Sequence, residues 1–453
     1  MLGTYEIITF GCQMNKADSE VLAGLLEEAG YRLHTGNGFA DVVLLNTCAV
    51  RDHAENKAYS YLGEYLALKE DNPAMVVGFA GCVAQKEGAK LLERFSQLDL
   101  VLGPRNLTAL AGYIRSIRED GKRIVAVDGE VDMADHSTPR QRSKTGQGWL
   151  TVMTGCDKFC SYCIVPYTRG REKSRPPGDI LAELKKLIEQ GYREITLLGQ
   201  SVNSYGKDLD EEITFCDLLA RANDLPGDFR LRFTSPHPMD TTDELIEAYR
   251  RLPRLAANIH LPVQSGSNRI LKAMNRKYTR EDYLEIIKKI RDLERYVSIT
   301  TDVIVGYPGE TEEDFQQTLD LFEEVRFSKA YIYRYSPRSG TRASRLVDTV
   351  PEPVVANRHA KLLDCYKKQA RIENQRLCGR TLQVFVEGSS PKSEPGNRQF
   401  TGRTSTNHVI VFDSLPEYCI GSFVPVKVDK AESYTLFGSV DPVFLAKNQP
   451  VRA

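Results

Sequence analysis

Three cysteines in one short stretch are the residues best suited to chemistry. Cys156, Cys160 and Cys163 lie in GCDKFCSYC, a C-x3-C-x2-C spacing just after the apolar segment 150–153. Three thiolates on one tight loop can bind three irons of a 4Fe–4S cluster and leave the fourth iron open, as catalytic metal sites do. The alternative is zinc, but zinc folds usually offer four ligands in close pairs, and no second close pair lies nearby. The spacing therefore favours a cluster with one open iron.

Three more cysteines each follow an apolar segment directly. They are Cys12 in ITFGCQMN, Cys48 in LLNTCAVR and Cys82 in VGFAGCVAQ. The ends of parallel strands converge at one edge of a sheet, so these cysteines are expected to form a second three-thiolate site. Buried structural cysteines are the alternative, because cysteine is among the most buried residue types. The remaining cysteines show no cluster spacing and are expected to be structural: Cys216, Cys365, Cys378 and Cys419.

The elements that must position these cysteines divide into three domains. Residues 1–127 alternate apolar runs with amphipathic stretches, which predicts a doubly wound α/β domain. The polar stretch 128–147 is expected to be a linker. Residues 148–375 hold six apolar strands between helices and end in a helix rich in Lys and Arg, which predicts a partial (β/α)6 barrel. The strand alternation of residues 376–447 predicts a small all-β barrel.

The composition narrows the class of protein. The chain has 453 residues, of which 41% are hydrophobic and 27% charged, as expected for a multidomain globular protein. It contains no apolar run of about eighteen residues and no signal peptide at its start, so we expect a cytoplasmic protein without a membrane span. Its ten cysteines then favour metal binding or catalysis over disulfides. The net charge of -1 gives no global nucleic-acid footprint, so RNA contacts would need local basic patches.

The cysteine loop resembles the signature of radical S-adenosylmethionine enzymes in its cysteine spacing and in its place after the first barrel strand. The six β/α units of the domain that carries the loop agree with this resemblance. That resemblance implies that S-adenosylmethionine binds the open iron. It also implies that an electron from the cluster cleaves the cofactor to a 5'-deoxyadenosyl radical, which abstracts hydrogen from an unactivated carbon. The protein would then mainly bind and orient the cofactor.

With both cysteine sets in one chain, the sequence is similar to the methylthiotransferases nearly end to end, and most similar to their MiaB family. The segments that carry the similarity are TFGCQMNKADSE, NTCAVRDHAENK, GCVAQKEG, GCDKFCSYCIVPYTRGREKSRP, LLGQSVNSYG, FTSPHP, HLPVQSGSNRILKAMNRKYT and TDVIVGYPGETEEDF. The final β region resembles a TRAM domain. Gln13, Met14 and Asn15 are typical of the branch that modifies tRNA, whereas Ser201 and Thr154 depart from the residues that many members have.

This resemblance implies two 4Fe–4S clusters, S-adenosylmethionine and a tRNA substrate. The expected product carries a methylthio group on C2 of N6-isopentenyladenosine next to the anticodon. The expected partners are a flavodoxin- or ferredoxin-type reductant and a sulfur donor that rebuilds the auxiliary cluster. No catalytic residue beyond the cluster ligands is assigned.

Further site residues are expected at the carboxyl ends of the barrel strands and in local basic runs. Tyr162 is expected to approach the adenine of the cofactor, with loop packing as the alternative. The other expected cofactor contacts are Gly199, Gln200, Ser235, Gln264, Ser265 and Gly306. The expected RNA contacts are Arg169, Arg171, Asn203 and Arg403. A solvated basic face is the alternative for the run that also contains Lys173 and Arg175. His237 and His260 are interpreted as structural.

Three other functions remain open from the sequence alone. The acceptor could be threonylcarbamoyl-adenosine of tRNA or an aspartate of a ribosomal protein. The chain could be a non-catalytic, metal-stabilised RNA-binding protein whose β-barrel is the working part. An electron carrier with two clusters is the third alternative, although a carrier needs neither a large barrel nor a terminal β domain.

Overall fold

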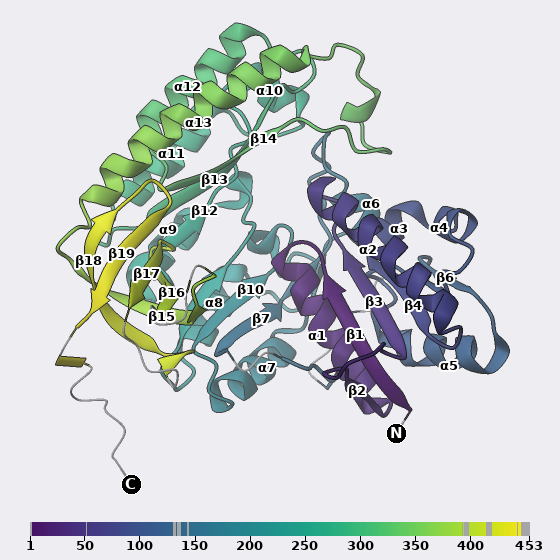
Figure 1. Ribbon diagram of the computed structural model, residues 1–453. Coiled ribbons are helices and arrows are strands. Elements are labelled where there is room, and N and C mark those ends of the chain that lie inside the picture. Colours follow the sequence, from purple (N-terminus) through teal and green to yellow (C-terminus); the bar gives the residue numbers. More distant parts are fainter. Residues whose placement is uncertain are drawn as a thin grey trace.

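The computed structural model describes residues 2–50, 52–129, 133, 137–142, 145–391, 393, 398–413, 419–441 and 443–444. An α/β domain at the N-terminus, a central partial barrel and a small β-barrel follow one another along the chain (Figure 1). This confirms the expected fold class. Among the described residues, no helix is both long enough and apolar enough to cross a membrane.

The N-terminal domain is built on a six-stranded parallel sheet in the order β2-β1-β3-β4-β5-β6. Its strands are β1 (Gly3–Thr9), β2 (Tyr31–Leu33), β3 (Val42–Thr47), β4 (Val76–Gly81), β5 (Leu100–Leu102) and β6 (Ile124–Ala126). Its helices are α1 (Gln13–Glu28), α2 (Asp52–Asp71), α3 (Cys82–Glu87), α4 (Lys90–Arg94), η1 (Leu107–Ala109) and α5 (Leu110–Asp120). Helices α1 and α5 cover one face, and α2, α3 and α4 cover the other. Because β3 and β4 are buried on both faces, their sequences VVLLNT and VVGFAG are almost continuously apolar.

The central domain contains two parallel three-stranded sheets, β7-β10-β11 and β12-β13-β14, which a parallel bridge between Leu231 and Leu255 connects. Its strands are β7 (Gln147–Thr151), β10 (Glu194–Leu198), β11 (Arg230–Phe233), β12 (Asn258–His260), β13 (Ser298–Val305) and β14 (Lys329–Arg334). Its helices are α6 (Val165–Arg169), α7 (Pro177–Glu189), η2 (Val202–Ser204), α8 (Phe215–Asn223), η3 (Pro238–Asp240), α9 (Asp243–Arg251), α10 (Asn268–Ala273), α11 (Arg280–Arg291), α12 (Glu312–Val325), η4 (Ala343–Arg345) and α13 (Glu352–Gln375). Capping boxes at Thr279 and Thr311 fix the starts of α11 and α12.

The segment 150–153, expected as one strand, is divided in the structure. β7 ends at Thr151, and β8 (Met153–Thr154) pairs in antiparallel fashion with β9 (Lys173–Ser174). Arg175 N donates to Val152 O at 2.9 Å and holds the start of this hairpin against the barrel strand. The residues between β8 and β9, which include the three clustered cysteines, therefore form one closed loop.

The C-terminal barrel closes in the order β15-β16-β17-β19-β18. Its strands are β15 (Thr381–Ser389), β16 (Gln399–Thr404), β17 (Val409–Asp413), β18 (Phe423–Ala431) and β19 (Thr435–Val440). Closure follows because β15 pairs with both β16 and β18, so that no described strand of this barrel presents an open edge. Alternating side chains of these strands fill its interior.

The turn between β16 and β17 docks on the amino ends of the central barrel strands. Arg232 on β11 donates to Thr404 O at 2.5 Å and to Ser405 O at 3.2 Å. Ser298 Oγ donates to Thr406 O at 2.7 Å, and Ala257 N donates to Ser405 Oγ at 2.9 Å. The buried carboxylate of Glu194 balances the charge of the guanidiniums that line this contact. The turn that follows Arg403, one of the expected RNA contacts, therefore serves as a contact between domains.

We expect Arg232→Met to loosen this contact, because it leaves the buried Glu194 carboxylate with one guanidinium fewer. Removing one partner of a buried pair costs about 3 kcal/mol of unfolding free energy. Arg193→Met is the matched control, since its ion pair with Asp228 is exposed and such pairs contribute about 0–1 kcal/mol. Thermal unfolding and limited proteolysis between α13 and β15 measure the difference. Equal stability of the two variants would contradict the prediction.

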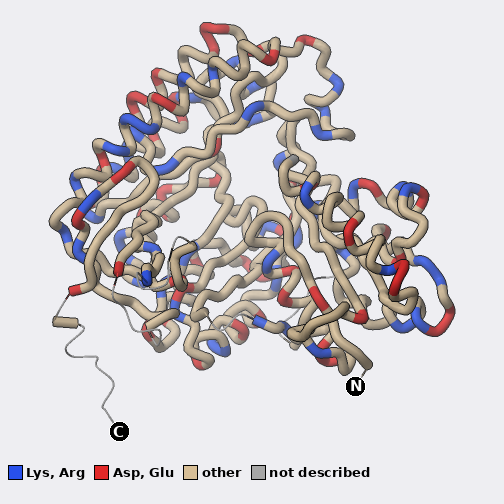
Figure 2. The backbone as a smooth tube through the Cα atoms, in the orientation of Figure 1, with Lys and Arg blue, Asp and Glu red and all other residues tan. Residues whose placement is uncertain are grey.

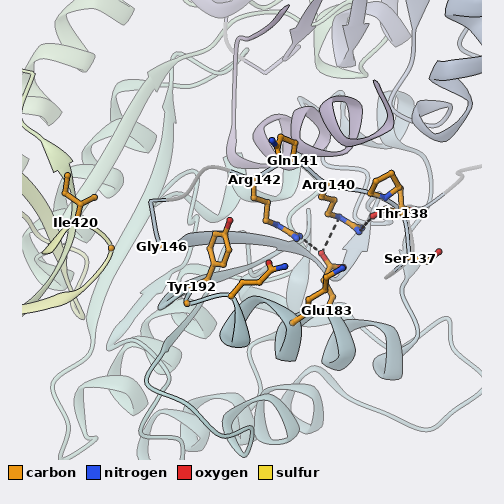
Figure 3. A pocket seen from close by; sticks show the side chains of 14 residues that line it. Ser137, Thr138, Arg140, Gln141, Arg142, Gly146, Glu183, Tyr192 and Ile420 are labelled. Atoms are coloured by element: carbon orange, nitrogen blue, oxygen red, sulfur yellow. Dashed lines mark hydrogen bonds and ion pairs between the residues drawn. The ribbon is translucent and has the colours of Figure 1, made fainter. Parts of the chain in front are cut away.

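Ion pairs between side chains hold the described part of the expected linker in place. Arg140 Nε lies 3.3 Å from Glu183 Oε1 on α7, and Arg142 also pairs with Glu183 (Figure 3). Gln141 N donates to Glu20 O of α1 at 2.9 Å. Residues 130–132, 134–136, 143 and 144 of the expected linker lie outside the described residues. The polar composition here serves specific contacts between the N-terminal and central domains.

Charged residues of both signs are interspersed along the outer helices α11, α12 and α13 (Figure 2). On α13, Lys361 lies 3.7 Å from Glu312, and Arg371 lies 3.9 Å from Glu432. The Lys and Arg residues of this helix therefore belong largely to a mixed surface, in keeping with the net charge of -1.

Candidate functional site

Cys156, Cys160 and Cys163 lie together on the loop between β8 and β9. Cys156 N donates to Gly170 O at 3.1 Å, and Cys163 N donates to Cys160 O at 3.0 Å. Burial raises the pKa of Cys156 and of Cys163 to about 12, and each thiol also feels the charge of Cys160. A metal group here must therefore displace protons when it binds. Phe159 has a φ of +48°, a left-handed conformation that is uncommon outside glycine. Such a strained backbone persists only where the surrounding structure enforces it, and it is often found at functional sites.

The cysteine loop rests on the turn after α10. Asn275 Nδ2 donates to Phe159 O at 2.9 Å, and Ser161 N donates to Met274 O at 2.9 Å. The buried Arg276 donates from Nη1 to Cys160 Sγ at 3.4 Å. These contacts fix the backbone of the loop and place a positive charge at one of its sulfurs.

Cys12, Cys48 and Cys82 meet at the carboxyl ends of three neighbouring strands, β1, β3 and β4. Gly11 makes the close approach possible, because an added Cβ would lie 2.4 Å from Cys48 Cβ. A hydrogen bond between the Cys12 and Cys48 side chains lowers the pKa of Cys12 to about 6 and raises that of Cys48. The structure thus brings together the three cysteines that the sequence places far apart, and it favours a thiolate at Cys12.

Among the described residues, no three His, Cys, Asp or Glu side chains group closely enough to share one metal ion. A four-iron cluster makes a different demand, because each thiolate binds its own iron. Two separate sets of three cysteines, each buried or half-buried, fit that demand.

Six of the expected cofactor contacts lie at the carboxyl ends of the barrel strands. Gly199 and Gln200 follow β10, and Gln200 Oε1 accepts from Gly155 N at 2.5 Å. Ser235 and Gln264 have φ values of +59° and +71°. Ser265 is buried, and Gly306 N donates to the buried Glu310 carboxylate at 2.8 Å in the turn after β13. The structure therefore places these six residues on one edge. Tyr162 lies on the cysteine loop instead, where it packs beside Met274 and Tyr307.

Buried polar atoms without partners at this edge fit a polar cofactor. Ser201 Oγ and His237 Nε2 are buried, and neither has a hydrogen-bond partner in the part of the chain that the structure describes. Burial lowers the pKa of His237 to about 2, so its imidazole is neutral. Its Nδ1 accepts from Met239 N at 3.2 Å, which leaves the proton on Nε2. The site thus offers a hydroxyl and an N–H donor that a bound amino-acid or ribose group can use.

The expected RNA contacts lie in four different environments. Arg169 is 5% exposed and bonded to Asp18 at 2.6 Å, so its guanidinium is buried and does not face solvent. Arg171 is exposed, where it stacks on Phe159 and lies 2.7 Å from Asp157. Asn203 Nδ2 donates to His237 O at 2.9 Å, and Asn203 Oδ1 accepts from His237 N at 2.8 Å. Arg403 is half-buried and pairs with Glu387 at 2.8 Å. Arg171 is the most accessible of the four.

Sequence reasoning missed several residues that contact this site. Asn275 and Arg276 lie in the quoted segment AMNRKYT, but the segment served only for the family resemblance and no role was assigned to them. His237 was interpreted as structural, yet its Nε2 lacks a partner among the described residues. No local sequence pattern indicates a role for Asp18, because its partner Arg169 is 151 residues away in the sequence.

Comparisons with known proteins follow the same three domains. Residues 4–103 match the family described as "Uncharacterized protein family UPF0004", residues 150–322 match the radical SAM superfamily, and residues 375–440 match the TRAM domain. A protein of Thermoanaerobacter sp. (strain X514) named "tRNA-2-methylthio-N(6)-dimethylallyladenosine synthase" is 44% identical, and the match covers 96% of this chain and 92% of that protein. A protein of the same name from Carboxydothermus hydrogenoformans is 44% identical, with coverages of 96% and 98%.

Two solved structures have a similar fold. The radical S-adenosylmethionine methyltransferase TsrM from Kitasatospora setae, solved with cobalamin and a 4Fe–4S cluster, has a TM-score of 0.55 and 15% identity. That similarity covers 76% of this chain and 77% of TsrM. The cobalamin-dependent S-adenosylmethionine radical enzyme OxsB has a TM-score of 0.53 and 13% identity over 81% of this chain and 56% of its own. Because both identities are below 25%, the likeness extends to the fold alone.

Proposed function

Because this chain belongs to the MiaB family of tRNA-2-methylthio-N(6)-dimethylallyladenosine synthases, we propose that its two cysteine sets bind two 4Fe–4S clusters that serve one reaction. The enzyme is a radical S-adenosylmethionine methylthiotransferase that acts on tRNA and uses a 4Fe–4S cluster. The finer assignment places the first cluster at Cys156, Cys160 and Cys163, and the auxiliary cluster at Cys12, Cys48 and Cys82. The observation that carries it is the convergence of those last three cysteines at the ends of β1, β3 and β4.

When bound, the first cluster supplies the electron that cleaves S-adenosylmethionine, and the auxiliary cluster supplies the sulfur for the product. The residues of the chain hold and shield these groups. Asn275 and Ser161 fix the loop of the first cysteine set, and Gln200 ties Gly155 to the end of β10. His237 and Ser201 offer their free polar atoms to the cofactor. Burial of both cysteine sets limits the access of water to the reacting groups.

We place the target adenosine, next to the anticodon, on the inner face of the sheet β12-β13-β14. Tyr331 and Tyr333 are 38% and 37% exposed, although they lie on a strand that packs against α13. Their register partners on β13 are Asp302 and Ile304, so these four side chains share the face opposite α13. His260 joins them, with Nε2 at 3.3 Å from Asp302 and its ring edge against Tyr331. Aromatic side chains of this kind stack on unpaired RNA bases.

Tyr331→Ala and Tyr333→Ala are therefore expected to raise the KM for tRNA about tenfold each, because base stacking contributes about 1–3 kcal/mol. Cleavage of S-adenosylmethionine without tRNA should stay unchanged. Tyr296→Ala is the matched control, since that side chain is 52% exposed but precedes β13 at the other end of the barrel. An unchanged KM in both inner-face variants would remove the adenosine from this position.

The substrate test uses the reconstituted, full-length enzyme with S-adenosylmethionine, a flavodoxin- or ferredoxin-type reductant and three acceptors. These acceptors are tRNA with isopentenyladenosine, tRNA with threonylcarbamoyl-adenosine, and the ribosomal protein with its aspartate. Mass analysis of the digested products should show a methylthio group on the isopentenyladenosine alone. Modification of either other acceptor instead would contradict the proposal.

Several turnovers per chain should require an added sulfur donor. A cytoplasmic location fits such partners.

A further inference from the structure

A buried ion pair connects the N-terminal and central domains beside the auxiliary cysteines. Arg169 Nη2 lies 2.6 Å from Asp18 Oδ2, and the two side chains are 6% and 11% exposed. Arg169 ends α6, which follows the first cysteine set, and Asp18 lies on α1, which begins directly after Cys12. The pair therefore joins the helix that follows the first cysteine set to the helix that follows Cys12, although the steps proposed above do not use it.

The guanidinium of Arg169 also contacts Cys82, one of the three auxiliary cysteines. Helix α6 packs against α3, whose first residue is Cys82. This packing brings the Arg169 side chain to the Cys82 thiol, to which it donates a hydrogen bond. Cys12 also feels the positive charge of Arg169 and the negative charge of Asp18. Two fixed charges of opposite sign thus act on the same thiols.

Stability alone is a weak reason for such a pair. A buried ion pair often contributes little to folding, because the cost of removing both charges from water offsets their attraction. Electrostatics gives it a second effect. One-electron reduction adds a negative charge to a cluster that three thiolates already make anionic, and charges act strongly in a buried, weakly polarisable environment. A nearby guanidinium stabilises the reduced state, and a nearby carboxylate destabilises it.

We propose that Arg169 and Asp18 are positioning residues that set the reduction potential of the auxiliary cluster through their opposite charges. The inference rests on the proposed function, since it requires a cluster at Cys12, Cys48 and Cys82. Arg169 raises the reduction potential and Asp18 lowers it. With both charges present, the potential lies between the values that either charge alone would give. Arg276, which donates to Cys160 Sγ at 3.4 Å, is the corresponding guanidinium at the first cysteine set.

The test measures the potential of the auxiliary cluster alone. Full-length protein with Cys156, Cys160 and Cys163 changed to Ala is reconstituted with iron and sulfide, and its iron content is counted. A redox titration followed by electron paramagnetic resonance then compares this protein with the same protein carrying Arg169→Met, Asp18→Asn, Arg169→Lys or both Arg169→Met and Asp18→Asn. Arg175→Met is the control, because Arg175 is equally buried and pairs with Glu183 at 2.7 Å, away from the cysteines.

The expected shifts have opposite signs. Arg169→Met should lower the potential, Asp18→Asn should raise it, and the double variant should return near the starting value. Arg169→Lys and Arg175→Met should shift it least. Asp18→Asn decides the matter if Arg169→Met does not retain iron, because asparagine keeps the size and the hydrogen-bonding oxygen of aspartate. Potentials that stay constant or move in the same direction in loaded proteins overturn the inference alone. Absence of iron from the starting protein overturns the proposed auxiliary cluster, and the inference with it.

Discussion

Release of 5'-deoxyadenosine is expected to stop when Cys156, Cys160 and Cys163 are all replaced by Ala, and iron should fall from about eight to about four per chain. The three thiols lie on one loop, so their removal leaves the N-terminal set intact. The matched variant replaces Cys12, Cys48 and Cys82 instead. It should also hold about four irons, but it should still cleave S-adenosylmethionine and transfer no methylthio group.

Iron and acid-labile sulfide in anaerobically reconstituted protein, together with chromatography of the nucleoside product, measure both variants. Zinc in place of iron in the unaltered protein would contradict the prediction and would favour a metal-stabilised RNA-binding protein. Loss of all iron in either triple variant would instead mean that the two sites do not load separately.

Gly155→Ala should remove the first cluster without touching a cysteine. Gly155 has a φ of +79°, and an added Cβ would lie 1.9 Å from Arg171 O and 2.7 Å from Gly170 O. These are backbone atoms of the segment that closes the cysteine loop, so no side chain can move aside. The left-handed conformation adds about 1–2 kcal/mol of strain. We expect about four irons per chain and no 5'-deoxyadenosine.

Gly178→Ala is the control for this variant, because no described residue outside its own helix turn lies within 4 Å of its added Cβ. It should keep both the iron and the activity of the unaltered protein. Far-ultraviolet circular dichroism checks that Gly155→Ala retains its helices and strands. A Gly155→Ala protein with full iron would mean that the loop can close in another way.

The sequence predicts the parts of this protein that follow from local pattern. Apolar runs locate β3 and β4, and the rule that parallel strand ends share an edge brings Cys48 and Cys82 to one place. The same rule places Gly199 and Gly306 at the carboxyl ends of the barrel strands. These predictions succeed because strand period and sheet topology are set within short segments.

Contacts between distant segments are the parts that local pattern does not give. Arg169 belongs to a basic run that is typical of an exposed face, and only the packing of α6 on α3 buries it against Asp18. The turn between β16 and β17 carries no local signal for a partner, and only the fold docks its residue Thr406 on Ser298 of the central barrel. In both cases the partner is more than one hundred residues away.

The docked turn also determines when the catalytic domain is completed during synthesis. Arg232 and Ser298 bond to carbonyls of residues 404–406, which leave the ribosome long after the barrel strands themselves. Until then these polar groups lack the acceptors of the last domain and keep only their partners within the central domain, such as Glu194 beside Arg232 and Ala257 O beside Ser298. In the nascent chain the amino ends of the barrel strands therefore stay uncovered until the last domain has been translated and its turn 404–406 can dock on them.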